Sequence, residues 1–204
     1  MYTPDLYKNE NQEEIKAFLK ENSFGILINQ TNGKLCATHI PMELAINADG
    51  KEILEGHISK LNPQAEGFRE NDQVLAVFSG AHSYISSSWY DHENVPTWNY
   101  IAVNVYGRIK IVDYETSVEQ LKKLVDKYEA NSENPVRVEN LSSKTMREAR
   151  GIFGLKIEID EIQATKKLSQ NRDNHNYKNI ISELEKTENP LSIAVAKEMS
   201  KCRK

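Results

Sequence analysis

The stretch from Trp98 to Val112 constrains the fold most, because its apolar residues alternate with polar ones. One face carries the apolar set Ile101, Val103, Val105, Ile109 and Ile111. The other face carries Asn104, Tyr106, Arg108 and Lys110. A period of two predicts a long strand with one face in a core and the other toward solvent. Gly107 interrupts the apolar face and predicts a bulge or bend there.

A hairpin is predicted near the N-terminus. Phe24 to Asn29 reads as a buried strand, and Leu35 to Ile40 reads as the strand that returns. Asn32-Gly33 lies between them, and both residues accept the positive φ that a tight hairpin turn needs. Pro41 then predicts an edge, a bulge or the end of the strand.

The remaining elements give a strand-rich chain with helices at its start, middle and end. Further strands are predicted at Met42 to Ile46, Glu52 to Ile58, Val74 to Phe78, Tyr84 to Tyr90 and Phe153 to Ile159. Helices are predicted at Gln12 to Glu21, from Pro63, at Val118 to Tyr128, at Ser143 to Arg150, around Tyr177 to Leu184 and from Pro190. From Gln163 to the first C-terminal helix the pattern loosens and predicts a loop. Seven or eight antiparallel strands that curl to remove their edges make a small barrel, not a doubly wound sheet.

Bulk properties narrow the class of protein. The 204 residues fit one large domain, or one domain with a small appendage. A net charge of −4 argues against a surface built mainly for nucleic acid. The N-terminus lacks the basic start and apolar stretch of a signal peptide, and no apolar run approaches the length of a membrane span. Cys36 and Cys202 share no metal or redox spacing, so we expect a cytoplasmic protein without a disulfide framework.

The stretch from Ser79 to Tyr100, SGAHSYISSSWYDHENVPTWNY, is the main candidate for a binding site. It holds both tryptophans, Trp89 and Trp98, and three tyrosines, with serine, threonine and asparagine between them. Large flat rings beside short polar groups suit a planar ligand with a polar edge. The alternative is two ordinary strands with a connecting loop, whose rings fill a core.

Other kinds of site are less favoured by the sequence. The five histidines, His39, His57, His82, His92 and His175, show neither helical nor zinc-finger spacing. No glycines flank Ser86-Ser87-Ser88 as a nucleophile elbow requires. No glycine-rich phosphate loop is present, so a phosphate would have to meet lysine, arginine and hydroxyl side chains. The candidates are Ser59, Lys60, Lys166, Lys167 and Arg172.

The C-terminal segment is more basic than the rest of the chain. Residues 161–204 hold nine Lys/Arg and six Asp/Glu, a net charge of +3, which leaves −7 for the remainder. A basic helix pair is one way to contact DNA phosphates. The sequence shows no glycine turn of the helix-turn-helix kind, so direct DNA contact is only one of the options left open.

Five motifs carry a resemblance to a known family. They are ATHIP (Ala37 to Pro41), GHISKLNPQ (Gly56 to Gln64), YISSSWY (Tyr84 to Tyr90), VPTWNY (Val95 to Tyr100) and KLSQNR (Lys167 to Arg172). In content, order and spacing they resemble the PaiB-type FMN-binding negative transcriptional regulators, most of all the Bacillus members named for repression of protease synthesis and sporulation. The likeness runs from Tyr2 to about Asn189. Many members of that family have proline at the position of Ser87 and tryptophan at the position of Ala65.

The resemblance implies a fold, a cofactor and an assembly. Its fold is the pyridoxamine-phosphate-oxidase-type split barrel, an antiparallel Greek-key barrel with peripheral helices and a C-terminal helix pair. It implies a homodimer with FMN in a cleft at the subunit interface. We accordingly expect residues 1–165 to form the FMN-binding domain and residues 166–204 to pack on the barrel or on its dimer partner.

The resemblance also allots the motifs to the parts of FMN. The phosphate is assigned to Thr38, Ser59, Lys60 and Arg172. The ribityl chain is assigned to Ser86, Ser88 and Thr97. The isoalloxazine ring is assigned to Trp89 or Trp98, with the amides of Asn99 and Gln170 at its edge. His39, Tyr84 and Lys167 complete the implied cofactor-binding set, and neither a catalytic residue nor a metal ligand is predicted.

The function implied is negative regulation of transcription, either by direct DNA contact or indirectly through a metabolite or partner. One alternative is an FMN-dependent oxidoreductase that acts on a small molecule, in which the flavin would supply the chemistry. No residue stands out as an acid, base or nucleophile for it. A second alternative is a haem-handling split-barrel relative, which needs an axial ligand such as histidine. A purely structural or interaction protein is the third.

Overall fold

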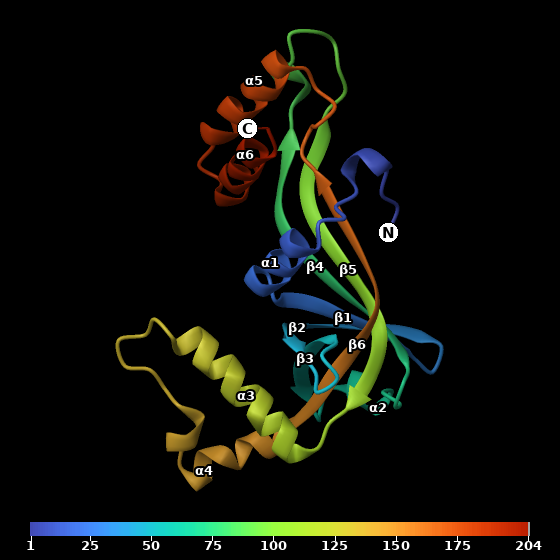
Figure 1. The fold of residues 1–204 in the computed structure, drawn as a ribbon, viewed down its shortest axis with the longest axis vertical. Helices are drawn as coiled ribbons and strands as arrows, with labels where there is room; N and C mark the ends of the chain where they lie inside the picture. The colour runs from blue at the N-terminus through green and yellow to red at the C-terminus, as the bar shows by residue number, and fades with distance from the viewer. Residues whose placement is uncertain (204) are drawn as a thin grey trace. The chain divides into compact units, whose positions relative to one another are not determined.

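The computed structural model describes residues 1–203, which form six strands closed into a barrel (Figure 1). The strands are β1 (Phe24–Thr31), β2 (Lys34–Ile46), β3 (Glu52–Ser59), β4 (Gln73–Ile85), β5 (Thr97–Ile111) and β6 (Ile152–Lys167). Their order around the barrel is β1-β2-β3-β6-β5-β4. The predicted barrel is confirmed, but the predicted count of seven or eight strands is wrong, because segments expected to be separate are continuous.

The helices lie at the start, middle and end of the chain, as predicted. The α-helices are α1 (Gln12–Glu21), α2 (Pro63–Glu66), α3 (Tyr114–Glu129), α4 (Ser143–Met146), α5 (Asn174–Glu185) and α6 (Pro190–Cys202). Short 3-10 turns are η1 (Asp5–Tyr7), η2 (Ser87–Trp89), η3 (Val138–Asn140) and η4 (Glu148–Gly151). The helix expected at Ser143 to Arg150 is therefore split into α4 and η4. Within residues 1–203, no helix is long and apolar enough to cross a membrane.

The chain divides into two compact units. The first unit comprises Met1–Phe18, Phe78–Asn104 and Gln163–Lys204, and the second comprises Leu19–Val77 and Val105–Ile162. Strands β4, β5 and β6 contribute residues to both. The first unit has its own buried cluster: Ile85, Tyr90, Leu168, Tyr177, Ile180, Leu184, Val195, Ala196 and Met199. In it α5 and α6 lie side by side (Figure 1).

The second unit contains the predicted N-terminal hairpin. β1 and β2 pair antiparallel from Phe24↔Pro41 to Thr31↔Lys34. The turn residues Asn32 and Gly33 have φ of 51° and 77°, which confirms the left-handed pair expected from Asn-Gly.

Pro41 does not end a strand, so the two strands predicted on either side of it are one, β2. The reason lies in the pairing. β2 pairs with β1 up to Phe24↔Pro41 and with β3 from Met42↔Gly56 onward. A residue without an N–H is tolerated where a strand changes partner, because little ladder hydrogen bonding is lost there.

The prediction of separate strands at Val74 to Phe78 and Tyr84 to Tyr90 is also wrong. β4 runs unbroken through Ser79-Gly80-Ala81 and ends at Ile85. Gly80 permits close packing here, since a Cβ atom would lie 2.5 Å from Cε2 of Phe18. The segment after Ile85 is the 3-10 turn η2, which the Ser86 hydroxyl caps by accepting from the Ser88 backbone N–H at 3.2 Å.

β6 extends further than predicted. The expected strand ends at Ile159 and a loop follows Gln163, whereas β6 continues to Lys167. In the first unit the N-terminal segment supports this extension. Lys8 and Thr165 form a β-bridge, and the hydroxyls of Thr3 and Thr165 lie 2.7 Å apart. Lys167 is therefore held on a strand and not on a loose loop.

Candidate functional site

The residues predicted to bind FMN fall into both units. Ten belong to the first unit: Tyr84, Ser86, Ser88, Trp89, Thr97, Trp98, Asn99, Lys167, Gln170 and Arg172. Four belong to the second: Thr38, His39, Ser59 and Lys60. Each set has its own local geometry.

Aromatic rings on β4 and β5 form an exposed edge in the first unit. Trp98 is 53% exposed and Tyr84 is 47% exposed. Their ring centroids are 6.3 Å apart in an edge-on arrangement, and the His82 ring lies 6.1 Å from that of Trp98. The alternative that the rings of this stretch fill a core holds for Tyr90, which is buried, but not for Tyr84 and Trp98. Exposed, clustered rings are typical of a surface that binds a ligand or another protein.

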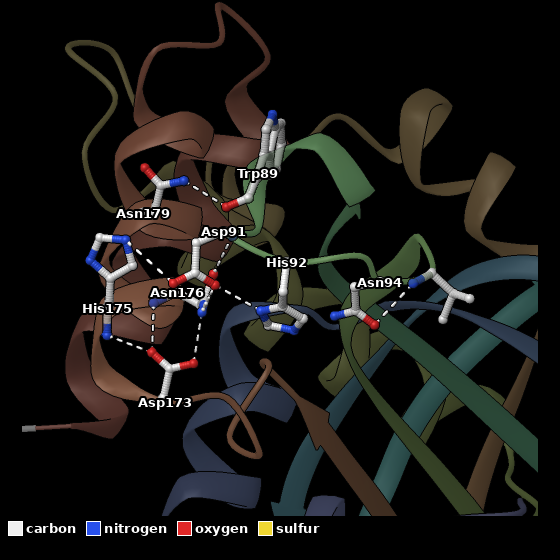
Figure 2. Close-up of polar contacts among 9 residues, drawn as sticks. Trp89, Asp91, His92, Asn94, Asp173, His175, Asn176 and Asn179 are labelled. Carbon is white, nitrogen blue, oxygen red and sulfur yellow. Dashed lines mark hydrogen bonds and ion pairs between the residues drawn. The ribbon is translucent and has the colours of Figure 1, made fainter.

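The loop after the SSSWY motif is anchored to helix α5 (Figure 2). The Asn179 side-chain amide donates to the Trp89 carbonyl at 2.6 Å. The Asn176 side chain accepts from the Asp91 backbone N–H at 3.1 Å and donates to the Asp91 carboxylate at 2.8 Å. These bonds fix the position of the Trp89 backbone against the helix.

Two aspartates complete this anchor (Figure 2). Asp91 lies 2.7 Å from His92 Nδ1, and hydrogen bonds from Asn176 and His92 lower the pKa of its carboxyl. Asp173 caps α5 by accepting from the backbone N–H groups of His175 and Asn176 at 2.9 and 3.0 Å. Hydrogen bonds from Asn176 lower the pKa of Asp173 to about 2. Both groups are therefore anionic at neutral pH.

Lys167 and Arg172 form a pair of cations beside Thr97. The Lys167 ammonium donates to the Thr97 hydroxyl at 2.5 Å. The pKa of Lys167 is lowered by burial and then by the positive charge of Arg172. Within residues 1–203 neither cation forms an ion pair with a carboxylate. Two neighbouring unpaired cations and a hydroxyl are a suitable site for a doubly charged anion.

Arg172 is positioned by Tyr90. Its guanidinium carbon lies 4.8 Å from the centroid of the Tyr90 ring, a cation–π contact. Its Nε atom is buried without a hydrogen-bond partner. The KLSQNR motif predicted Arg172. Tyr90 was not predicted, and its place at the end of YISSSWY was the only signal for it.

The two amides assigned to the flavin ring edge have partners inside the first unit. Asn99 is fully buried, and its side-chain amide exchanges bonds with the Ser169 hydroxyl at 3.0 and 3.1 Å. Gln170 accepts from the Leu168 backbone N–H at 2.7 Å and donates to the Lys166 carbonyl. The Ser86 and Ser88 hydroxyls, assigned to the ribityl chain, lie 2.8 Å apart and are accessible in part.

In the second unit the ATHIP and GHISKLNPQ motifs meet. The Thr38 hydroxyl accepts from the Asn62 side-chain amide at 2.9 Å and also contacts the Gln64 amide oxygen. Gln64 in turn donates to the Leu27 carbonyl at 3.0 Å. Asn62 accepts from the Gln64 backbone N–H at 2.9 Å, which confirms the predicted cap at the start of α2.

The other three residues of this unit that were predicted to bind FMN are exposed. The Lys60 ammonium donates to the Arg150 carbonyl at 2.7 Å. The Ser59 hydroxyl accepts from the Leu61 backbone N–H at 3.2 Å, and the His39 ring lies 6.2 Å from that of Phe24. Lys60 is thus partly committed to a backbone carbonyl.

Unpartnered buried polar atoms test whether these residues suit FMN. In the first unit they are the Tyr90 hydroxyl, the Asn94 amide nitrogen and Arg172 Nε. All three can donate a hydrogen bond, and buried donors need acceptors. FMN presents acceptors in its phosphate and ring carbonyl groups, so the first unit fits it. Among residues 1–203, no group of three or more His, Cys, Asp or Glu is arranged to hold a metal ion.

Comparison with known proteins identifies the family. Residues 1–161 match the family model described as "Putative FMN-binding domain". The chain belongs to this family. It is 43% identical over 200 residues to the protease synthase and sporulation protein PAI 2 of Bacillus subtilis, covering 98% of this chain and 96% of that protein. The predicted family resemblance and the predicted cofactor, FMN, are confirmed.

Solved structures confirm the split-barrel fold class. The flavocytochrome Anf3 of Azotobacter vinelandii superposes with a TM-score of 0.62 at 18% identity, over 84% of this chain and 75% of that chain. An FAD- and haem-binding protein of Mycobacterium smegmatis gives a TM-score of 0.60 at 15% identity, over 79% of this chain and 73% of that chain. At such identities the likeness concerns the fold.

Proposed function

We propose that the chain is an FMN-binding negative regulator of transcription that acts as a cytoplasmic homodimer. The proposal of flavin binding rests on Lys167 and Arg172, two neighbouring cations without a carboxylate partner, and on the Thr97 hydroxyl. The regulatory part rests on the motif resemblance and on the name of the Bacillus subtilis relative, which refers to protease synthesis and sporulation.

Lys167, Arg172 and Thr97 would hold the phosphate of FMN. Charge-assisted hydrogen bonds from lysine and arginine to phosphate are about twice as strong as neutral ones. The exposed rings of Trp98 and Tyr84 would take the flat isoalloxazine. When bound, the flavin supplies a ring that can be reduced and oxidised. The assignment of Thr38, Ser59 and Lys60 in the second unit to the phosphate stays a prediction, and the Lys60 ammonium has the Arg150 carbonyl as a partner.

Flavin titrations test the phosphate assignment. FMN fluorescence is followed as protein is added, for the wild type and for Lys167→Met and Arg172→Met. Each variant should bind FMN roughly ten- to a hundredfold more weakly, because a hydrogen bond to a charged group is worth about 1.5–3 kcal/mol. Riboflavin, which lacks the phosphate, should bind all three proteins equally. Lys178→Met, an exposed lysine on α5, is the matched control and should leave FMN affinity unchanged.

Two results would contradict this assignment. One is unchanged FMN affinity in both variants. The other is an equal loss of riboflavin affinity, since that would mean the substitutions disturb the fold and not a phosphate contact. The same samples test the alternatives. Turnover of NAD(P)H with FMN would favour an oxidoreductase, and a Soret band would favour haem binding.

Homodimer formation is supported by the exposed rings of Tyr84 and Trp98, because large exposed apolar groups favour burial in an interface. Light scattering coupled to size exclusion should give twice the chain mass across the concentration range. A monomer at every concentration, with and without FMN, would refute the dimer.

The surfaces of α5 and α6 favour indirect repression over DNA contact by these helices. Lys186 pairs with Glu183 and Lys201 with Glu198, each at 2.5 Å. Arg203 donates to the Gln170 and Arg172 carbonyls. A cation that already has a partner neutralises few DNA phosphates and so releases few of the counterions bound to DNA. The helices should therefore bind DNA weakly. One result would overturn this view: tight binding to DNA upstream of the regulated genes that weakens steeply with salt and is lost in the double variant Lys178→Met/Lys197→Met.

A transcript measurement tests regulation itself. Deletion of the gene should raise transcripts for proteases, and the wild-type chain should restore repression. The Lys167→Met variant should restore it less well if flavin is needed. Unchanged transcripts after deletion would refute the regulatory proposal while leaving the flavin titrations unaffected.

A further inference from the structure

A small cavity lies in the second unit, between helix α3 and the strands β2 and β3. Its volume is about 190 Å³. None of the fourteen residues predicted to bind FMN lines it. Sites for drug-sized ligands span roughly 300–1,000 Å³, so this cavity is too small for a flavin nucleotide. A ligand of few atoms is the appropriate occupant.

Gln120 of α3 lines this cavity and carries a buried acceptor without a partner. The side chain is 6% exposed, and its Nε2 donates to the Leu155 carbonyl at 3.3 Å. A backbone carbonyl only accepts, so this bond fixes the orientation of the amide. The Oε1 atom therefore points away from Leu155, and it is buried without a hydrogen-bond partner. A buried acceptor left unpaired is destabilising, and a ligand N–H would satisfy it.

The charges that line the cavity balance. Glu55 Oε2 lies 3.1 Å from the Lys123 ammonium, and Glu43 Oε2 lies 2.6 Å from that of Lys127. Two carboxylates and two ammonium groups favour a ligand without net charge. Burial lowers the pKa of His57, so its imidazole adds no positive charge at neutral pH. Lys156, which does not line the cavity, lies 3.9 Å from Glu55 Oε1.

The depth of the charged groups sets the orientation of a ligand. The Glu55 side chain is only 9% exposed, whereas that of Lys123 is 64% exposed. The interior thus offers acceptors, in Glu55 and Gln120 Oε1, and a lysine ammonium stands toward solvent. Pro41, Ala45 and Leu124 add an apolar wall.

We propose that this cavity, named here the Gln120 cavity, binds a small zwitterionic amine of the size of a free amino acid. The ligand ammonium donates to Gln120 Oε1 and faces Glu55. The ligand carboxylate accepts from Lys123. This site goes beyond the flavin site and does not depend on it.

Calorimetric titration of the full-length chain with the twenty free amino acids, one at a time, tests the proposal. At least one should bind. Its N-acetyl derivative lacks the ammonium and its decarboxylated amine lacks the carboxylate, and each should bind about tenfold more weakly or worse. No binding by any amino acid would overturn the proposal, and so would equal binding of the N-acetyl derivative.

Two variants locate the site. Gln120→Met keeps the length of the side chain and removes the acceptor, so it should weaken binding about tenfold. Ala45→Phe fills the cavity from the β2 wall and should abolish binding even if Gln120→Met fails to fold. Glu119→Gln, at the exposed neighbouring position of α3, is the control and should bind as the wild type does. Wild-type affinity in both cavity variants would refute the site.

FMN titration of the same variants separates this proposal from the proposed function. The Gln120 cavity variants should bind FMN with unchanged affinity. Loss of FMN binding in Ala45→Phe together with loss of amino acid binding would overturn the claim of a separate site. Failure of the Lys167 and Arg172 predictions would leave the Gln120 cavity untouched.

Discussion

Ser169 offers the sharpest test of how the first unit holds its candidate site. Ser169 is buried, and its backbone has a φ of +59°, in the left-handed region that favours glycine. Its hydroxyl is the oxygen partner of the fully buried Asn99 amide, at 3.0 and 3.1 Å. The Asn99 amide has one further contact, to Met199 Sδ at 3.5 Å, which is a weak acceptor. Ser169 therefore combines a hydrogen bond that stabilises with a backbone conformation that destabilises.

Substitution by alanine and by glycine separates the two effects. Ser169→Ala removes the hydroxyl and keeps the left-handed backbone, so the Asn99 amide loses its partner where water cannot replace it. The free energy of unfolding should fall by about 1–3 kcal/mol. Ser169→Gly removes the same hydroxyl but suits the backbone, since a left-handed conformation costs a non-glycine residue about 1–2 kcal/mol. Glycine also gains entropy in the unfolded chain, which leaves a net advantage over alanine of about 1 kcal/mol.

Equilibrium unfolding in urea, followed by circular dichroism, measures the three proteins. The expected order of stability is wild type, then Ser169→Gly, then Ser169→Ala. Ser200→Ala, which removes a hydroxyl from the exposed face of α6, is the control and should change stability by less than about 0.5 kcal/mol. An alanine variant as stable as the wild type would refute the buried hydrogen bond, and a glycine variant less stable than alanine would refute the argument from φ.

Three further predictions concern single residues. Burial raises the pKa of Tyr177 to about 12. The stability that its neutral hydroxyl contributes is complete below the unfolded pKa of about 10 and is lost as pH rises toward 12. In Tyr177→Phe the free energy of unfolding should therefore fall less between those pH values. The pKa of Asp173 is lowered to about 2, so its carboxylate stabilises the start of α5 above about pH 4. This contribution is lost as pH falls toward 2. Asp173→Ala should remove the corresponding loss of helix content, measured by circular dichroism. Gly107→Ala should destabilise by about 1–3 kcal/mol because the new Cβ would collide with the Glu158 backbone carbonyl, whereas Gly151→Ala, with no atom within 4 Å of the new Cβ, should leave urea unfolding almost unchanged.

Local signals in the sequence predicted many elements well. Helix α1 begins after the Asn11 cap and covers the predicted range Gln12 to Glu21, because Asn11 accepts from the Glu13 and Glu14 backbone N–H groups at 3.1 and 3.3 Å. The Asn32-Gly33 turn, the α2 cap and the C-terminal helix pair follow from equally local chemistry. Element boundaries set by contacts distant in sequence were missed.

Pro41 and Gly80 show why. Pro41 predicted an edge, a bulge or a strand end, and Gly80 falls between two predicted strands, yet both lie inside continuous strands. The bulge or bend at Gly107 stays a prediction. Pro41 sits where β2 changes partner. Gly80 and Gly107 leave room for Phe18 and for the β6 backbone. These reasons depend on neighbours far along the chain, which periodicity cannot reveal.

The sequence predicted the residue types of the candidate site but not their hydrogen-bond and ion-pair partners. The motifs led to Lys167, Arg172 and Asn99, yet only the structure distinguishes the unpaired cations from the buried, paired amide. Tyr90 and Asn94 gave no signal beyond their place in a motif-rich stretch. The division into residues 1–165 and 166–204 stays a prediction.

The two candidate sites lack opposite hydrogen-bonding partners, and this difference constrains their ligands. In the first unit the buried groups without partners can donate, and two cations stand unpaired beside them, so the missing partner is an anionic acceptor. In the Gln120 cavity the group without a partner is an acceptor, and its charges already balance, so the missing partner is a donor without net charge. One small molecule does not meet both requirements, since a phosphate would bring further negative charge next to Glu55, and an ammonium would bring a third cation next to Lys167 and Arg172. If both sites are occupied in the cell, they should therefore respond to two different ligands, and any coupling between them would appear as equal changes in both affinities.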